Sequence, residues 1–438
     1  MSTQKKFDRS KIMSSLVKRY INVDDILGGT ESMQAAGQKY LFKEPKESDI
    51  NYKLRLRRTT LFPAYSRSVK NAVGKVYTKP LKVELPEILE EMRWNVDGAG
   101  QSMEAFAKDV TEKAIHYGIT YIFVDYPKST AESLADERNL NNNPYFVQIT
   151  PLEVLEINTQ WINNKLTLTY VRFFEDFYED GEYHQQVKEL TLNGSTVEYS
   201  IYRKDKKDQE YLHDTGVMSG VDAIPLVPVY GKKIAPYHGT PSLYDLYELN
   251  VAHWRAYSDF MNITHYSQVP MLKVKGLTPE YDDAGQKQDV IISSNTVFDL
   301  PAEGDVAWVE VSGNASKVGQ ELLKDLEQKM AVIGLQLFMN TSERVTATEN
   351  ILDAAEEQSM LKSIVIDIEY ALNEALVLAA IFKSVNTELV SLSIDSSYTV
   401  TNNSDFKYVM DMYNAGIVAA EDVLSEAKNR NIFKQSES

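Results

Sequence analysis

Two long helical patterns, separated by a turn-rich segment, constrain the fold of this chain most strongly. The first covers about 241–266, with a proline near its first turn and no glycine inside, and the second covers about 315–338. Both repeat apolar residues at spacings of three and four, which is typical of a helix with one buried face. Each is long enough for a helix of roughly 36 Å at 1.5 Å per residue. Between them, 267–312 carries prolines and glycines at short intervals and predicts short strands and turns.

The apolar positions predict which faces the two helices bury. In the first helix they are Leu243, Leu246 or Tyr247, Val251, Trp254, Tyr257 or Ser258, Met261 and Thr264 or His265. In the second helix they are Val318, Leu322, Leu326, Met330, Ile333 and Leu337, while Lys317, Lys324 and Gln328 fall on another face. We therefore expect the two helices to pack through apolar stripes, with the lysines on a different side.

The remaining helical patterns lie on both sides of this pair. One runs through about 49–76, and Pro63 should kink or divide it because proline cannot donate a helical hydrogen bond. Another begins at Ser102, a residue suited to cap a helix, and stops at Gly118. The longest runs through about 347–383, for roughly ten turns. The first of these is rich in cations, which indicate either a solvated face or a contact to an acidic neighbouring subunit: Arg55, Arg57, Arg58, Arg67 and Lys70.

Strand patterns fill much of the first half of the chain. A buried strand is predicted at 119–124, directly after the glycine that ends a helix. From 144 to about 229 the sequence predicts a β-meander, with hairpin turns at Asp180-Gly181 and Asn193-Gly194. At 438 residues the chain exceeds what one core usually holds, so roughly two to four sub-domains are expected. The predicted fold class is α+β, with several domains.

Composition excludes some function classes. With 63 acidic and 46 basic residues the formal charge is −17, which disfavours tight binding of nucleic acid, although weak or sliding contact stays open. There is no cysteine, and therefore no disulfide or thiolate metal site. The first residues lack the apolar core of a secretory signal, and the longest apolar run, Leu376–Phe382, is far shorter than the ~20 residues of a membrane span. A cytoplasm-like compartment is expected.

No catalytic or cofactor motif is visible. There is no phosphate-binding G-x-x-x-x-G-K-[ST] loop and no G-x-S-x-G elbow, and the six histidines show no metal-ligand spacing. Acidic pairs such as Glu356-Glu357 and Asp282-Asp283 could bind Mg²⁺, but solvated surface is the simpler interpretation. We expect no catalytic residue, metal site or cofactor.

Several strings, taken in order, resemble the portal proteins of tailed bacteriophages, and in particular a portal-like group described only as a domain of unknown function. The resemblance covers most of the chain from about 50 to 430, and its ordered set, rather than any one motif, is what identifies it. The strings include AYSRSVKNAVGKVYTKP (64–80), AIHYGITYIFVDYP (114–127), TPSLYDLYELNVAHWRAYSDFMNITHY (240–266), LPAEGDVAWVEVSG (300–313), LLKDLEQKMAVIGLQLF (322–338) and TATENILDAAEEQSML (346–361).

The resemblance implies a portal-like subunit with an α/β wing, a two-helix stem, a small β-containing clip and a helical C-terminal crown. Such subunits form a ring, usually of twelve, at one capsid vertex, where double-stranded DNA enters during packaging and leaves during ejection. Implied partners are terminase, a head-completion or adaptor protein, and the major capsid or scaffolding protein; no membrane is implied, and the location is the virion after assembly in the host cytoplasm. The implied divisions are 1–49 as a polar N-terminal segment, 50–239 wing, 240–266 first stem helix, 267–312 clip, 313–338 second stem helix, 339–348 tunnel loop, 349–400 long helix and following strand, and 401–438 short crown and tail.

Candidate channel-lining residues follow from this mapping. Lys317 and Lys324 would face the lumen, although pairing with Glu321 and Glu327 on the same helix explains them equally well. The tunnel loop would add Asn340, Thr341, Ser342, Glu343 and Arg344. Two other functions remain open: a capsid-associated or scaffolding protein without a channel, and a metal-dependent nucleic-acid enzyme.

Overall fold

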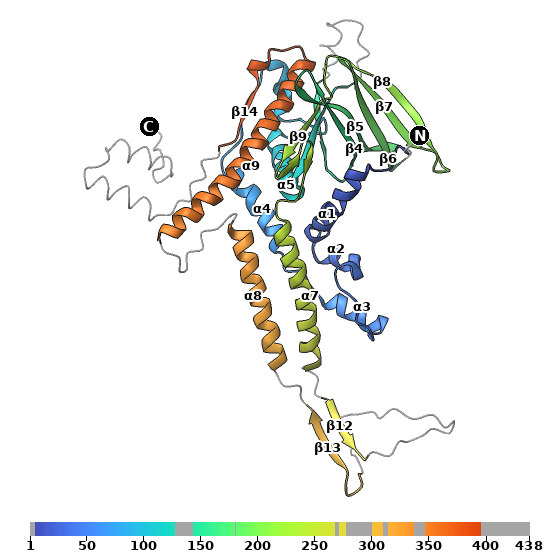
Figure 1. The fold of residues 1–438 in the computed structure, drawn as a ribbon, viewed down its shortest axis with the longest axis vertical. Helices are drawn as coiled ribbons and strands as arrows, with labels where there is room; N and C mark the ends of the chain where they lie inside the picture. Colours follow the sequence, from blue (N-terminus) through green and yellow to red (C-terminus); the bar gives the residue numbers. More distant parts are fainter. Residues whose placement is uncertain are drawn as a thin grey trace, which may run out of the picture.

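The fold consists of a mixed α and β body from which two long helices and a β-hairpin project (Figure 1). The computed structural model describes residues 5–127, 143–179, 181–267, 271–276, 300–309, 314–336 and 347–395. The fold class is α+β, as predicted. The loop residues Asn340 to Arg344 and the region 401–438 lie outside the described residues, and so do parts of 267–312.

An N-terminal arm descends beside the projecting helices. It contains α1 (Lys11–Leu27), α2 (Gly29–Ala36), the short 3-10 helix η1 (Gly37–Lys39) and α3 (Asp49–Arg58). The chain then turns back into α4 (Ala64–Val76), whose N-terminal boundary is Pro63, so the proline divides the helical pattern as predicted. The oxygen of Ser48 accepts the backbone N–H of Asn51 and caps α3, satisfying a donor that the first helical turn leaves free.

The largest sheet is an antiparallel meander of five strands. Its order is β4 (Val154–Ile162), β5 (Lys165–Glu179), β6 (Glu182–Asn193), β7 (Thr196–Lys204) and β8 (Glu210–Met218). Gly181 and Gly194 take positive φ angles of 89° and 65° in the two hairpin turns that the sequence predicted.

The ends of the predicted meander belong to a different sheet. There β2 (Ile119–Asp125) lies between β3 (Tyr145–Ile149) and β9 (Leu226–Tyr230). The prediction of a single meander over 144–229 was therefore wrong at both ends. The physical reason is that β2 is buried on both faces as a central strand, so both of its edges need hydrogen-bonding partners.

Gly118 joins α5 (Met103–Tyr117) to this three-stranded sheet. It has a left-handed φ of 77°, and its carbonyl accepts the backbone N–H groups of Gly231 and Lys232. The backbone of Thr240 runs so close that a Cβ on Gly118 would lie 1.7 Å from its carbonyl oxygen. This crossing fixes where the chain leaves the body and enters the projecting helices.

The other elements complete the body around two cores. They are β1 (Lys82–Glu84), η2 (Glu87–Arg93), β10 (Lys233–Ala235), β11 (His238–Gly239), α9 (Ala347–Phe382), η3 (Thr387–Leu389) and β14 (Ser391–Ser393). One core joins the arm, α4, α5, α9 and the parts of α7 and α8 nearest the body. The other core lies between the two larger sheets. The long helix at 347–383 was predicted, and α9 confirms it.

The projection consists of α7 (Tyr244–Ser267), α8 (Asn314–Gln336) and, beyond them, the hairpin of β12 (Met271–Lys275) and β13 (Asp305–Val309) (Figure 1). The burial of Leu246, Val251 and Trp254 confirms the first part of the stripe predicted for α7.

The stripe predicted for α8 was partly wrong. Val318 is 66% exposed and Leu322 is 49% exposed, whereas Leu323, Leu326 and Met330 are buried. The buried residues alternate three- and four-residue steps, which is the spacing that keeps one helix in contact with a partner. The stripe of Val318 and Leu322 lies on a second apolar face, which periodicity alone could not rank against the first.

Replacement of Gly118 should destabilise the fold more than replacement of a glycine in open space. In Gly118→Ala the new Cβ meets the Thr240 backbone as well as the strained φ, and we expect a loss of about 4 kcal/mol or more, typical of severe overpacking. Gly194→Ala, with a similar φ and no atom within 4 Å of the new Cβ, should cost only about 1–2 kcal/mol. Thermal melting of both variants is the measurement, and equal shifts would contradict the role of the crossing.

Candidate assembly surfaces on the projecting helices

The lysines selected from the sequence lie on the outer surface of α8. Lys317 and Lys324 are seven residues apart, so they share one face of the helix, and both are exposed. The same helix buries Leu323, Leu326 and Met330 on another side. The two ammonium groups therefore point away from the core, toward solvent or another molecule.

Intrahelical pairing does not account for these lysines. Within the described part of the chain neither Lys317 nor Lys324 forms an ion pair, and Glu327 instead lies 3.3 Å from His253 Nε2 on α7. An ion pair along α8 joins Lys329 Nζ to Asp325 Oδ2 at 2.7 Å. The alternative partners Glu321 and Glu327 are thus not the ones that hold the two lysines.

His253 is a packed residue of the helix pair. Its ring is buried, 5.2 Å from the ring of Phe62 between centroids, and stacks on Tyr257. Burial lowers the pKa of His253, and the carboxylate of Glu327 opposes that effect only in part. The imidazole is therefore neutral at neutral pH and links α7 to α8 by a polar contact.

A buried ion pair attaches the arm to the other side of α7. Arg55 on α3 donates from Nε to Glu47 Oε1 at 2.9 Å and from Nη2 to Glu47 Oε2 at 2.8 Å. Its Nη2 also donates to the carbonyl of Phe42 at 2.7 Å, and its Nη1 donates to Ser258 Oγ on α7 at 3.4 Å. The guanidinium thus binds both oxygens of the Glu47 carboxylate, and bidentate pairs of this kind are among the stronger hydrogen-bonded contacts in proteins.

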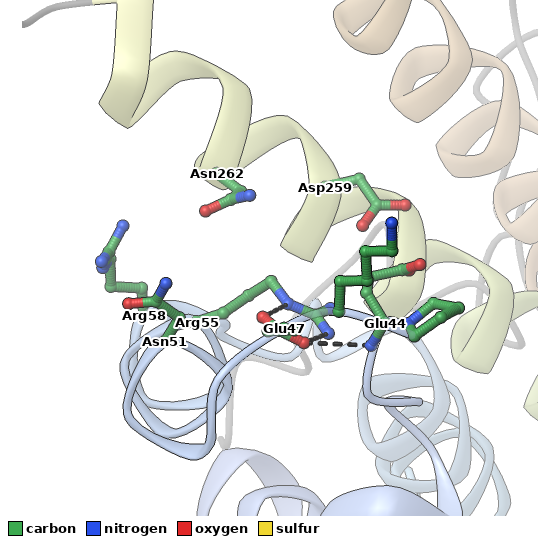
Figure 2. Close-up of a pocket in the computed structure, with 9 residues that line it drawn as sticks. Glu44, Glu47, Asn51, Arg55, Arg58, Asp259 and Asn262 are labelled. Carbon is green, nitrogen blue, oxygen red and sulfur yellow. Dashed lines mark hydrogen bonds and ion pairs between the residues drawn. The ribbon is translucent and has the colours of Figure 1, made fainter.

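This ion pair borders a cleft of about 520 Å³ between the arm and α7. Figure 2 shows Arg55 turned toward Glu47, with Asp259 and Asn262 approaching from α7. Arg55 is only 5% exposed, which corrects the expectation that this arginine belongs to a solvated face or a subunit contact. The physical reason is that Glu47, eight residues earlier and on a loop, satisfies it; helical periodicity carries no signal for such a contact.

The groups that line the cleft favour the ionised forms of Glu47 and Arg55. The hydrogen bonds from Arg55 lower the pKa of Glu47, while those same bonds raise the pKa of Arg55. Burial raises the pKa of Asp259, with Arg55 opposing. The guanidinium therefore holds Glu47 ionised and anchors the arm to α7.

A second buried cation lies between the sheets. Lys188 Nζ lies 2.6 Å from Asp125 Oδ2 and 3.4 Å from Glu175 Oε1, beside a cavity of about 610 Å³. Burial lowers the pKa of Lys188, but the carboxylates of Glu175 and Asp125 outweigh it and leave a net rise. The amine stays protonated, so it has no free electron pair for nucleophilic chemistry.

The described residues form neither a metal cluster nor a membrane-spanning helix. No group of three or more His, Asp or Glu side chains there is arranged to hold a metal ion. No helix in the described ranges combines the length and apolar character that crossing a membrane requires.

Removal of the Glu47 carboxylate should loosen the arm. Glu47→Gln leaves Arg55 buried without its anion, and we expect a local loss of about 3 kcal/mol, measured as faster amide hydrogen exchange in 41–58. Asp49→Asn, which breaks the exposed pair with Lys43, is the control and should leave exchange in the same segment nearly unchanged.

The same contact should depend on pH. Because the folded-state pKa of Glu47 is lowered, its contribution is complete above the ordinary glutamate pKa and is lost as the pH falls through the lowered value. Protection of 41–58, corrected for intrinsic exchange, should fall on acidification in the natural chain and stay flat in Glu47→Gln. An equal acid response in both chains would contradict the assignment.

One part of the chain is similar in sequence to a known family. Residues 242–383, about a third of the chain and all of α7, α8 and α9, match a family described as a domain of unknown function (DUF4055). No curated protein matches the sequence.

Solved structures with a similar arrangement come from gene transfer agent (GTA) particles. A chain in the neck of the empty GTA particle, computed with C6 symmetry, is 10% identical, with 82% of this chain and 88% of that one covered and a TM-score of 0.41. A chain in the native neck, computed with C12 symmetry, is 11% identical, with 91% and 97% covered and a TM-score of 0.42. A chain in the native virion is 11% identical, with 90% and 97% covered and a TM-score of 0.41. These scores describe a loose likeness.

Proposed function

We propose that this chain is a non-enzymatic subunit of a portal-type ring at a capsid vertex, with an axial channel for double-stranded DNA. DNA would pass inward during packaging and outward during ejection, without recognition of its sequence. Terminase would dock during packaging, and an adaptor and tail afterwards. The location would be the virion, after assembly in the host cytoplasm.

The projection of α7 and α8 is the observation that carries this proposal. Helices of 24 and 23 residues extend from the body and pack mainly on each other, so much of their surface faces outward. Val318, Leu322 and Val332 on α8 are each close to half exposed or more. Long helices that leave apolar residues outside are stabilised when neighbouring copies cover them. A ring of subunits provides such neighbours on both sides.

The charge distribution suits a channel. Lys and Arg side chains that neutralise phosphates supply most of the affinity of proteins for DNA, so many of them along a lumen would hold the DNA in place. The chain carries a formal charge of −17, and Lys317 and Lys324 form a sparse row on the outer surface of α8. Weak contacts to phosphates, spaced by acidic surface, permit sliding.

The fold can be divided on this proposal. α7 and α8 would form the stem, the β12–β13 hairpin part of the clip that meets terminase and adaptor, and the sheets with α4 and α5 the wing. α9 would be the long helix that follows the tunnel loop. Asn340, Thr341, Ser342, Glu343 and Arg344 would line the narrowest part of the channel, and 401–438 would form a short crown.

Two alternatives make different predictions. A scaffolding or other capsid-associated protein would form oligomers without a hole along the axis. A metal-dependent nucleic-acid enzyme would degrade DNA or hydrolyse ATP.

Electron microscopy of the purified chain tests the proposal directly. We expect round particles with a central hole and a mass close to twelve times 49.7 kDa. Solid oligomers would favour the scaffolding alternative. Nuclease or ATPase activity of the pure protein would favour the enzyme.

Charge reversal at the two lysines should affect DNA passage and not assembly. In Lys317→Glu/Lys324→Glu the lumen would lose its cations and repel phosphates, so the amount of packaged DNA per particle should fall severalfold while rings form normally. The control is Lys206→Glu in the exposed turn between β7 and β8, which should leave packaging unchanged. Loss of the rings themselves would place the lysines in a subunit contact instead.

A further inference from the structure

Helix α3 carries an exposed amphipathic face with cations. Ile50, Lys53, Leu54 and Arg57 follow the i, i+3, i+4, i+7 spacing, so they lie together on one side of the helix. Ile50 is 71% exposed and Leu54 is 44% exposed, and both cations are exposed as well. Arg55 occupies the opposite, buried side against α7. The face is therefore separate from the ion pair that anchors the arm.

Helix α8 carries a face with the same spacing and the opposite charge. Val318, Glu321, Leu322 and Asp325 are again at i, i+3, i+4 and i+7, and all four are exposed. Asp325 pairs with Lys329, but both of these side chains are more than half exposed, and such a pair exchanges partners at little cost. Each face thus presents two apolar side chains beside two like charges, and the charges of the two faces are complementary.

The two faces lie on opposite sides of α7. Arg55 of α3 reaches Ser258, whereas Gly319 of α8 packs against Phe260, where a Cβ would come within 3.1 Å of the ring. Two residues along a helix correspond to about 200°, so Ser258 and Phe260 point in nearly opposite directions. Figure 1 shows the same arrangement, with α8 and α3 flanking α7 and α3 level with the half of α8 nearer the hairpin.

We propose that the α3 face of one subunit (Ile50, Lys53, Leu54, Arg57) docks on the α8 face of the next subunit (Val318, Glu321, Leu322, Asp325). The partner is a second copy of this chain. Two different, complementary faces on opposite sides of one subunit form a head-to-tail contact, and repetition of such a contact closes into a ring when the rotation permits. This inference rests on the proposed ring and specifies which surfaces join it.

The contact leaves the two lysines available. Lys317 and Lys324 lie on a different side of α8 from Val318 and Leu322, because a step of one or two residues turns a helix by about 100–200°. Glu321, four residues after Lys317 and three before Lys324, lies between these two sides. One face of α8 can therefore meet a neighbouring subunit while another faces the channel. Apolar contact would supply most of the stability, and the paired charges would select the neighbour and its orientation.

The absence of cysteine makes a direct cross-linking test possible. Leu54→Cys and Leu322→Cys are placed in separate chains and in one chain, and the assembled protein is treated with a short bis-maleimide. Mixed single variants should give a covalent dimer, and the double variant should give a ladder of higher multimers. Leu54→Cys with Val217→Cys, an exposed valine on the edge strand β8, is the control and should stay monomeric on a denaturing gel.

The outcomes of the cross-linking test distinguish a failure of the α3–α8 contact from a failure of the proposed ring. Dimers from Leu322→Cys alone would indicate a symmetric contact and overturn the head-to-tail pairing. Particles with a central hole but no ladder from the double variant would overturn the α3–α8 contact and leave the proposed function standing. Neither particles nor cross-links would count against both.

Charge exchange gives a second test that does not depend on the cross-linker. Lys53→Glu/Arg57→Glu and Glu321→Lys/Asp325→Lys should each lower the fraction of chain in rings by about tenfold or more, because like charges then face each other. The chain that carries all four substitutions should recover assembly. Failure of that chain to assemble, with its melting temperature unchanged from the natural chain, would contradict the proposal.

Discussion

The packing of α8 on α7 is the contact on which the rest of the projection depends. Leu323, Leu326 and Met330 are buried along α8, and Gly319 allows close approach to Phe260. α8 covers one side of α7, and the arm contacts another side of α7 through Arg55. The side of α8 that faces away from α7 remains exposed. On the proposed function, a second copy of the chain and DNA would contact the exposed sides of α8.

The buried charges stabilise the junctions between distant segments. Arg55 ties the loop at Glu47 to α3 and to Ser258 on α7, and Lys188 ties β6 to Asp125 on β2 and Glu175 on β5. Both cations are hydrogen-bonded to carboxylates, and removal of Glu47, or of Asp125 and Glu175 together, would leave an uncompensated charge in a poorly solvated site. Both cations therefore act as anchors between segments of the fold.

Element type was largely predictable from the sequence, because it depends on local patterns. Pro63 divides a helix, Ser102 and Gly118 bound another, and glycines at 181 and 194 form the hairpin turns. Pairing between elements was less predictable: β3 and β9 flank β2 instead of extending the meander, and α8 buries Leu323 rather than Leu322. Neighbouring positions on an apolar helix have similar hydrophobicity, and only the partner's shape chooses between them.

The sequence by itself determined the helix pair, the long α9, the hairpins, the acidic balance with its few outer lysines and the resemblance to portal proteins, since each depends on residue type and spacing along the chain. Only the tertiary structure decided that Arg55 is buried against Glu47. It also decided that Lys317 and Lys324 form no ion pair within the described residues. It placed Ile50 and Leu54 on a side facing away from α7, and Val318 and Leu322 on the opposite side of the projection. Residue spacing does not encode these relations, because they arise only when the segments pack, as Arg55 does on Ser258, 203 residues away.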